Sequence, residues 1–515
     1  MAKAADLILY NANVLTLDPK RPRAKLVAVE GERIIWVGDN DKLRDLEGRR
    51  TQKIDCQGKT LVPGFNDAHC HILAFASSLS SVDCSPSSVA SITDIKAQIR
   101  QQAQKLPKGT WIRATGYNEF YLTEKRHPNR YDLDQAAPDH PVKLAHRSRH
   151  ACVLNSLALS LVGISMESPE PAGGMIERDL DSGKPNGILY EMNSYIEALM
   201  PPPTDEEFEK GIELANDGYL SQGITSLKDA TAHNGMREWR TFQRLKEAGF
   251  LVPRLSVMIG IESLGELQDN GFSPHYGDNW IRLGALKIVL SEARGSLHPE
   301  KEELEEQVLQ AHQAGYQLAL HAVEESTVEA ATKALAHALS QIPRRNHRHR
   351  IEHCSVCPPA LLDRLRDAHV IVVTQPSFIY YSGERYLKTV PEVQLRWLYR
   401  IGSFLENGLI PAAGSDSPVV PINPLVGIYA AVSRKAESGE ELLPQEGISP
   451  VEALKMYTQA SAYASFDEGV KGSLAVGKLA DSALLSADPT QVPPEEIKNI
   501  CVEMTIAGGR IAWQA

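Results

Sequence analysis

Long apolar segments, a disulfide framework and an excess of basic residues are all missing from this chain of 515 residues. No apolar run approaches the ~20 residues of a membrane-spanning helix, so we expect no membrane partner. The first six residues lack the basic and then apolar pattern of a secretory signal. Seven cysteines, an odd number, are too few for a disulfide-rich fold. Together these absences predict a cytoplasmic protein in a reducing compartment.

The charge balance is acidic. The chain holds 54 Lys and Arg against 65 Asp and Glu, a net charge of −11. Nucleic-acid binding usually needs a basic surface, so we expect no nucleic-acid partner. Hydrophobic residues make up 43% and charged residues 23%, which allows a large packed core and excludes wholesale disorder.

Both ends of the chain have a sequence pattern typical of short strands separated by turns. The expected strands are residues 7–10, 14–17, 25–29 and 33–37 at one end, and 472–474, 480–485, 502–507 and 510–513 at the other. Chain ends often lie close together, so we predict one composite β-sandwich domain from residues 1–62 and 468–515.

The middle of the chain alternates strands with helical periodicity, as in residues 302–314. The expected strands are 61–62 leading into Phe65, 224–227, 255–259, 286–289, 317–320, 350–352, 370–373 and 409–412. Eight such alternations predict an α/β fold, a (β/α)8 TIM-like barrel over residues 63–74 and 206–467.

One interval in the barrel is far too long. From Thr225 to Ser256 is 31 residues, but from Asp67 to Thr225 is 158. We therefore predict an inserted subdomain at residues 75–205, closed by the stiff segment 200–203. Loops after barrel strands open on the catalytic face, so the insertion is expected to cap the site.

The candidate chemistry falls at strand ends. His69 and His71 lie two residues apart, a spacing that puts them on one face of a strand. His321, His353 and Asp416 each follow a different expected strand, where barrel enzymes keep their functional groups. A single histidine at a strand end is more often structural, but five such residues on one rim favour a metal site.

Lys287 stands inside an apolar strand, where a charged and unpaired amine is costly. It needs an ionic partner, a lowered pKa or a chemical change. Carbamylation by carbon dioxide would make it a carboxylate that can bridge two cations. The residues themselves leave these alternatives open.

The combined pattern resembles the amidohydrolase superfamily, specifically its YtcJ-like group (amidohydrolase family 3). The resemblance covers nearly the whole chain and is carried by segments 63–71 (PGFNDAHCH), 414–418 (GSDSP) and 472–481 (GSLAVGKLAD). It implies that His69 and His71 bind one metal ion and that His321 and His353 bind a second. It also implies that Lys287 is a bridging carboxylated lysine, that Asp416 binds metal and relays protons, and that the protein forms a homodimer.

These ligand types suit a divalent metal, most simply one or two Zn²⁺ ions. We therefore predict hydrolysis of a non-peptide, amide-type C–N bond of a small molecule by a metal-activated water. Asp416 would act as general base and acid, and His353 would assist. The alternatives are ester hydrolysis or ring deamination at the same site, or a catalytically silent barrel used for assembly.

The substrate contacts are less well defined. Tyr117, Arg149, His150 and Glu191 lie in the inserted segment and are candidates for substrate binding, although each could be structural. The sequence differs from the motifs usual in the group at 148–150, 291–296 and 322–325. The metal-ligand candidates themselves match the group. We therefore expect the departures to affect which substrate is bound. The basic run 344–350 predicts a solvated loop.

Overall fold

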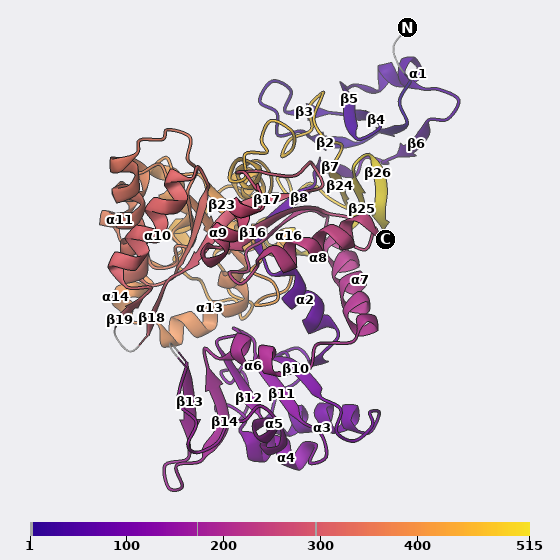
Figure 1. Ribbon diagram of the computed structural model, residues 1–515. Helices are drawn as coiled ribbons and strands as arrows, with labels where there is room; N and C mark the ends of the chain where they lie inside the picture. The colour runs from indigo at the N-terminus through magenta and orange to yellow at the C-terminus, as the bar shows by residue number, and fades with distance from the viewer. Residues whose placement is uncertain (1–3, 172–173, 294–295) are drawn as a thin grey trace. The chain divides into compact units, whose positions relative to one another are not determined.

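A computed structural model describes residues 4–171, 174–293 and 296–515. The chain divides into two compact units (Figure 1). We call residues 1–71, 216–416 and 421–515 the large unit, and residues 72–215 and 417–420 the small unit. Each is considered by itself.

An eight-stranded parallel sheet forms the centre of the large unit, in the order β23-β22-β21-β20-β17-β16-β15-β8. Its strands are β8 (Phe65–Cys70), β15 (Ile224–Asp229), β16 (Arg254–Gly260), β17 (Ile281–Val289), β20 (Leu318–Ala322), β21 (Arg350–His353), β22 (Ile371–Thr374) and β23 (Pro411–Ala413). The predicted α/β barrel is confirmed. Parallel strands need long crossovers, and helices supply them here (Figure 1).

Amphipathic helices connect these strands. They include α7 (Asp205–Ser221), which starts in the small unit, α8 (Met236–Glu247), α9 (Leu264–Asp269), α10 (Lys301–Gln313), α11 (Glu325–Gln341), α12 (Pro359–Asp367), α13 (Ser377–Thr389), α14 (Glu392–Leu395), α15 (Ile401–Glu406), α16 (Pro424–Ser433), α17 (Pro450–Lys455) and α18 (Ser461–Tyr463). In α10, Leu304, Val308 and Ala311 are buried on one face, and two glutamates occupy the first turn, where the helix dipole favours them. The predicted helix 302–314 is therefore confirmed within one residue.

Two sheets are built from the chain ends, in the orders β5-β4-β1-β6 and β26-β25-β24-β7-β2-β3. Their strands are β1 (Leu7–Tyr10), β2 (Asn13–Leu15), β3 (Arg23–Ala24), β4 (Leu26–Glu30), β5 (Arg33–Gly38), β6 (Gln52–Asp55), β7 (Thr60–Pro63), β24 (Ser482–Leu485), β25 (Val502–Ala507) and β26 (Arg510–Gln514). One cluster of buried apolar side chains draws on both sheets, for example Leu9, Val27 and Ile506. The antiparallel pair β7–β24 joins the two ends of the chain.

The strand predicted at 61–62 is present but belongs to a different sheet, and the strand predicted at 472–474 is absent. Residues 61–62 belong to β7 of a terminal sheet, and the barrel begins only at Phe65, because Pro63-Gly64 interrupts the extended run. Residues 472–474 form no strand. Gly472 has a φ of +86°, a left-handed value that glycine tolerates, and the Leu474 amide donates to the carbonyl of Thr16, the residue that follows β2.

The predicted loop at 344–350 is present up to residue 349, but the expectation that all of it is solvated is wrong, because residues 347–350 are buried. Arg348 forms a two-pronged ion pair with Glu468, and His349 is fully buried. His349 Nε2 lies 2.9 Å from His312 Nδ1, and the His349 amide donates to His347 Nδ1. Partners from distant segments, which a local charge count does not include, remove these groups from water.

This histidine cluster gives a pH prediction. Burial lowers the pKa of His347 to about 4 and the pKa of His349 well below its ordinary value of 6.5. The folded rings stay neutral while unfolded rings take up protons, so stability is lost as pH falls from about 6.5 towards 4. His347→Asn keeps an acceptor for the His349 amide. We expect it to flatten the decline in melting temperature between pH 6.5 and 4, and an unchanged slope would contradict the assignment.

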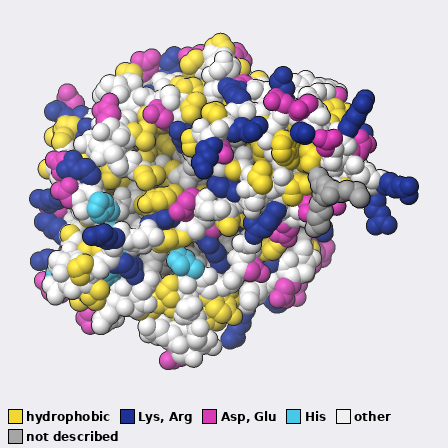
Figure 2. Space-filling view, turned by 90° about the horizontal axis from the view of Figure 1, so that it is seen from above, with side chains coloured by type: hydrophobic (Ala, Val, Ile, Leu, Met, Phe, Trp, Pro, Cys, Tyr) yellow, Lys and Arg dark blue, Asp and Glu magenta, His cyan; other side chains and the backbone are white. Residues whose placement is uncertain are grey.

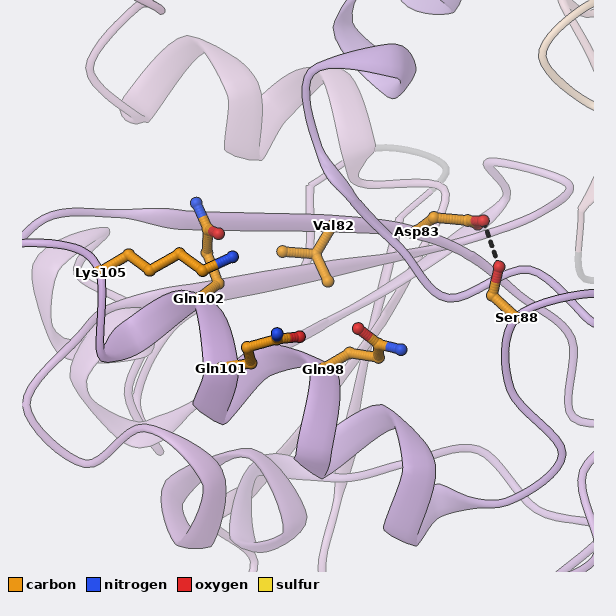
Figure 3. A pocket seen from close by; sticks show the side chains of 7 residues that line it. All are labelled: Val82, Asp83, Ser88, Gln98, Gln101, Gln102 and Lys105. Carbon is orange, nitrogen blue, oxygen red and sulfur yellow. Dashed lines mark hydrogen bonds between the residues drawn. The ribbon is translucent and has the colours of Figure 1, made fainter.

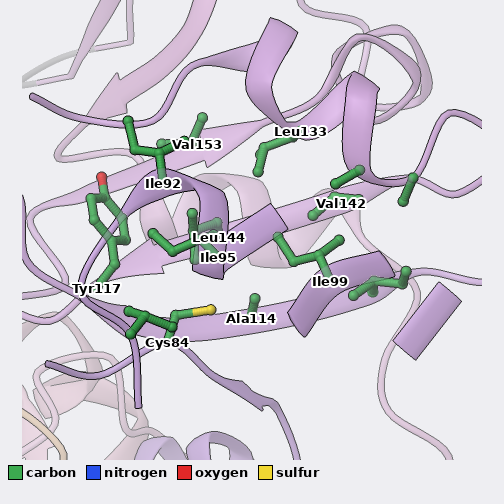
Figure 4. Packing of buried hydrophobic residues seen from close by; sticks show 14 of the residues in the cluster. Cys84, Ile92, Ile95, Ile99, Ala114, Tyr117, Leu133, Val142, Leu144 and Val153 are labelled. Atoms are coloured by element: carbon green, nitrogen blue, oxygen red, sulfur yellow. The ribbon is translucent and has the colours of Figure 1, made fainter. Parts of the chain in front are cut away.

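The small unit is a six-stranded mixed sheet in the order β13-β14-β12-β11-β10-β9. Its elements are α2 (Ile72–Leu79), β9 (Val82–Asp83), α3 (Ile92–Ala103), β10 (Ile112–Tyr117), α4 (Arg130–Ala136), β11 (Val142–His146), β12 (Ala151–Leu154), α5 (Ser156–Leu161), β13 (Met175–Arg178), β14 (Pro185–Tyr190) and α6 (Asn193–Leu199). Figure 4 shows Ile92, Ile95 and Ile99 of α3 packed over Leu144 of the sheet. Asn129 and Asp132 form a capping box that fixes the start of α4.

The face of the molecule in Figure 2 is mixed in charge and also carries hydrophobic side chains. Figure 2 shows Lys and Arg side chains interspersed with Asp and Glu across the face in view. Among the residues that the structure describes, no helix combines the length and apolar character that crossing a membrane requires.

Candidate metal centre

His69 and His71 lie at the carboxyl end of β8, and their ring centroids are 5.3 Å apart. Asp416 follows β23, and its Oδ1 lies 3.1 Å from His71 Nε2 and 3.4 Å from His69 Nε2. His69 and Asp416 are buried, whereas His71 keeps 24% of its side chain exposed. One carboxylate oxygen therefore faces two imidazole nitrogens at the rim of the barrel.

His353 and His321 come from the neighbouring strands β21 and β20. The ring of His353 lies 4.9 Å from that of His69 and 4.4 Å from that of His321. The donor atoms of His69, His353 and Asp416 all fall within 4.8 Å of one another, and all three residues are buried. The structure thus brings together five residues that are up to 347 positions apart in the sequence.

The backbone at these strand ends is unusual. His353 has a φ of +70° and Asp416 a φ of +58°, left-handed backbone values that residues other than glycine rarely adopt. Such conformations cost of order 1–3 kcal/mol each and persist where surrounding contacts enforce them, often at functional sites. Here they turn each side chain at the point where its strand ends.

Electrostatics keep this cluster in a metal-binding form. Burial, together with the Lys287 charge, lowers the pKa of His69 to about 3, and burial also lowers the pKa of His353. Burial alone would raise the pKa of Asp416, but the bond from His71 and the nearby His69 and His353 outweigh it and hold the pKa below its ordinary value. Neutral imidazoles beside an ionised carboxylate are the donor set that binds a divalent cation.

Lys287 lies in β17 and is 2% exposed. Among the described residues its Nζ has no hydrogen-bond partner. Burial lowers its pKa to about 8, although the charges of Glu352 and Asp416 favour the protonated form. A buried amine without a partner fits a group that is modified or that contacts a ligand.

Hydrogen bonds join β8 to Ser415 and Asp416, the residues that follow the other terminal strand of the barrel sheet. Asp67 accepts bonds from the amide and the hydroxyl of Ser415, at 2.9 and 2.5 Å, and the Asp416 amide donates to the His69 carbonyl at 2.7 Å. Burial raises the pKa of Asp67 to about 6 despite these bonds. The contacts set the distance between Asp416 and His69.

Gly414 gives a second prediction. A Cβ at this position would stand 2.6 Å from the His69 amide nitrogen and 2.7 Å from the His69 Cβ. We expect Gly414→Ala to push Asp416 away from His69, to cost about 1–3 kcal/mol of stability and to weaken metal binding. Gly469→Ala is the matched control, because its Cβ would meet nothing within 4 Å. Equal metal affinity in both variants, measured by titration, would contradict the prediction.

Sequence reasoning missed three partners of the histidines. Glu352 contacts His69, Gln375 contacts the Nδ1 of His353 at 2.7 Å, and Thr231 contacts the Nδ1 of His71 at 3.0 Å. Glu352 offered a signal, since an acid inside the apolar strand that ends in His353 needs a buried partner. Gln375 and Thr231 follow β22 and β15 without any distinguishing pattern.

The four substrate candidates all lie in the small unit. Tyr117 is fully buried, and its hydroxyl lies 2.8 Å from His127 Nδ1. Arg149 pairs with Glu197 at 3.2 Å. His150 and Glu191 pair with each other at 2.8 Å and are both exposed. Each therefore has an intramolecular contact, and their substrate roles stay predictions.

The small unit holds a pocket of about 230 Å³. Figure 3 shows the side chains that line it, which are Val82, Asp83, Ser88, Gln98, Gln101, Gln102 and Lys105. Its polar lining combines three glutamine amides with Asp83, Ser88 and Lys105, and it includes none of the predicted site residues. In the departure at 291–296, residues 294 and 295 lie outside the described residues.

Comparison with known proteins identifies the class to which this fold and these residues belong. The amidohydrolase family matches residues 52–512, so the chain belongs to this family. It is a hydrolase that acts on carbon–nitrogen bonds other than peptide bonds.

Individual relatives span the whole chain. N-substituted formamide deformylase from Arthrobacter pascens is 30% identical over 100% of this chain and 99% of its own length. Putative amidohydrolase YtcJ from Bacillus subtilis is 25% identical over 98% and 99%. A crystal structure of an uncharacterized metal-dependent hydrolase from Pyrococcus furiosus is 25% identical, with a TM-score of 0.73 over 94% of this chain and 100% of that one. The resemblance to the YtcJ-like group is confirmed.

Proposed function

We propose that the protein is a metal-dependent hydrolase of N-formyl or N-acyl amines, with its metal centre at His69, His71, His321, His353, Asp416 and a carboxylated Lys287. The observation that carries the proposal is the buried convergence of His69, His353 and Asp416 donor atoms within 4.8 Å. Family membership implies a divalent metal. The imidazole-rich donor set favours one or two Zn²⁺ ions.

The substrate class follows from the relatives. The Arthrobacter pascens protein, which matches along its whole length, is named for N-substituted formamides. The sequence of this chain differs from the motifs usual in its group at 148–150, 291–296 and 322–325. The amine part of its substrate is therefore expected to differ from that of the relative's substrates. The substrate candidates are Tyr117, Arg149, His150 and Glu191.

The chain's own groups supply orientation and proton transfer. A cation held by these residues would supply two things: it would lower the pKa of a water molecule towards ~7, and it would polarise the carbonyl oxygen of the substrate. Asp416 Oδ1, which is ionised and next to two imidazoles, would accept the proton of the attacking water and would later return it to the leaving nitrogen. His353, whose Nδ1 is held by Gln375, presents its Nε2 to the reacting centre.

The remaining finer assignments are part of the proposal. They are the composite β-sandwich of residues 1–62 and 468–515, the barrel of 63–74 and 206–467, and the capping role of 75–205. The cytoplasmic location and the homodimer also stay predictions.

The proposal is tested by assaying zinc-loaded and chelator-stripped protein side by side on N-substituted formamides, matched esters and aminated heterocycles. We expect hydrolysis of the formamides that disappears with the metal and returns on reloading. Preference for the esters or the heterocycles would replace the proposed reaction by another at the same site. Metal-free protein as active as loaded protein would reject the metal centre itself.

A further inference from the structure

Two charged side chains inside the barrel have no role in the proposed reaction. Arg350 and Glu352 lie on β21, and their side chains are 2% and 0% exposed. Arg350 Nε donates to Glu352 Oε1 at 2.5 Å, and its Nη2 donates to Oε2 at 2.8 Å. This two-pronged geometry is typical of a guanidinium and an ionised carboxylate. A charged pair buried this deeply is a costly way to stabilise a barrel, since apolar residues of similar size often stabilise more.

The carboxylate makes a third contact, with a second residue. Glu352 Oε2 lies 2.5 Å from Nδ1 of His69. An ionised carboxylate can only accept hydrogen bonds, so Nδ1 of His69 must carry the proton. The other ring nitrogen, Nε2, then keeps its lone pair, and it is this atom that lies 3.4 Å from Asp416 Oδ1. The carboxylate contact thereby selects the tautomer of the imidazole.

Arg350 also holds the strand that carries His69. Its Nη2 donates to the carbonyl of Ala68 at 2.7 Å, one residue before His69. β21 and β8 are not neighbours in the sheet, because β22 and β23 stand between them on one side. The contacts therefore cross the barrel interior and fix both the backbone and the ring of His69.

We propose that Arg350 and Glu352 are positioning residues that hold His69 in its Nδ1–H form, with Nε2 directed at the metal. The inference rests on the proposed metal-binding role of His69. Carboxylate partners of metal-ligating histidines typically contribute 10–100-fold to metal affinity, because they orient the ring and raise its basicity.

The test uses Glu352→Gln and a matched control. A glutamine cannot form the two-pronged ion pair with Arg350. Its amide can also donate as well as accept, so it does not fix the proton on Nδ1 of His69. The control is Asp481→Asn, which breaks another buried fork of the large unit, Arg254 with Asp481 at 2.7 and 3.1 Å and 2% and 4% exposed. We expect Zn²⁺ affinity, measured by competition with a chromophoric chelator, to fall about 10–100-fold in Glu352→Gln and to stay within about 2-fold in Asp481→Asn.

A second variant separates positioning from folding. Arg350→Lys keeps the positive charge but loses the two-pronged hydrogen bonding to Glu352. We expect a smaller loss of Zn²⁺ affinity in the same direction, and no additional loss when Arg350→Lys is combined with Glu352→Gln, because both act through one contact. The absorption bands of the Co²⁺-loaded variants should shift, which a purely structural defect would not cause. If Glu352→Gln does not fold, Arg350→Lys carries the test.

The outcomes distinguish the two proposals. Wild-type Zn²⁺ affinity in a folded Glu352→Gln, or in a folded Arg350→Lys where only that variant is obtained, would overturn the positioning role. An equal loss in Asp481→Asn would also overturn it. Wild-type protein that binds no divalent metal would instead reject the proposed function.

Discussion

Replacing Asp416 with asparagine is expected to lower kcat/KM for a formamide substrate by about 10²–10⁴-fold. The carboxylate oxygen of Asp416 lies within 3.4 Å of His69 Nε2 and 3.1 Å of His71 Nε2. An asparagine keeps the shape of the side chain but can neither take up a proton nor neutralise a cation. The measurement is steady-state hydrolysis with metal in excess, so that weakened metal binding alone does not account for the loss.

Asp467→Asn is the control for this prediction. Asp467 is also a buried aspartate of the large unit, paired with Arg282 at 2.7 Å and with Lys471 at 3.0 Å. Its replacement is expected to lower stability and to leave kcat/KM nearly unchanged. If both variants kept near-wild-type activity, the role of Asp416 in proton transfer would be wrong.

Lys287→Met is expected to have opposite effects on metal binding and on stability. The proposed carbamate would be lost, so binding of a second Zn²⁺ should disappear and activity should fall with it. The metal-free variant, however, should be about 1–3 kcal/mol more stable than metal-free wild type, because an amine without a hydrogen-bond partner among the described residues is replaced by an apolar chain. The measurements are zinc stoichiometry and chemical denaturation of the stripped proteins.

Lys228→Met supplies the matched comparison. Lys228 lies on β15, is 1% exposed, and its Nζ likewise has no hydrogen-bond partner among the described residues. Burial lowers the pKa of Lys228 well below its ordinary value. Its replacement should raise stability in the same way and leave zinc stoichiometry unchanged. Equal zinc stoichiometry in Lys287→Met and wild type would show that Lys287 is not a bridging ligand.

The barrel and the rim residues could be predicted because each signal is local. A short apolar run followed by a histidine or an aspartate identifies a strand end, and parallel strands of a barrel end at the same rim. Four of these residues therefore converge in the structure although they lie far apart in the sequence: His69, His321, His353 and Asp416. The shift of the first strand from 61–62 to Phe65 left this convergence intact, since β8 still ends beside His69.

The partners of these residues could not be predicted, because they depend on register across the barrel. Glu352 meets His69 only because β21 and β8 face each other through the interior, and no sequence pattern reports that distance. The burial of His349 depends in the same way on His312, which lies 37 positions earlier on α10. Local charge describes an isolated segment, whereas burial depends on which distant segment packs over it.

The proposed reaction requires a cation bound by His69, His353 and Asp416. Crystals of the zinc-loaded protein, measured above and below the zinc absorption edge, test this claim. We predict an anomalous peak about 2.0–2.2 Å from a nitrogen of His69, a nitrogen of His353 and an oxygen of Asp416. Zinc bound elsewhere, with these three side chains in contact only with one another, would contradict it.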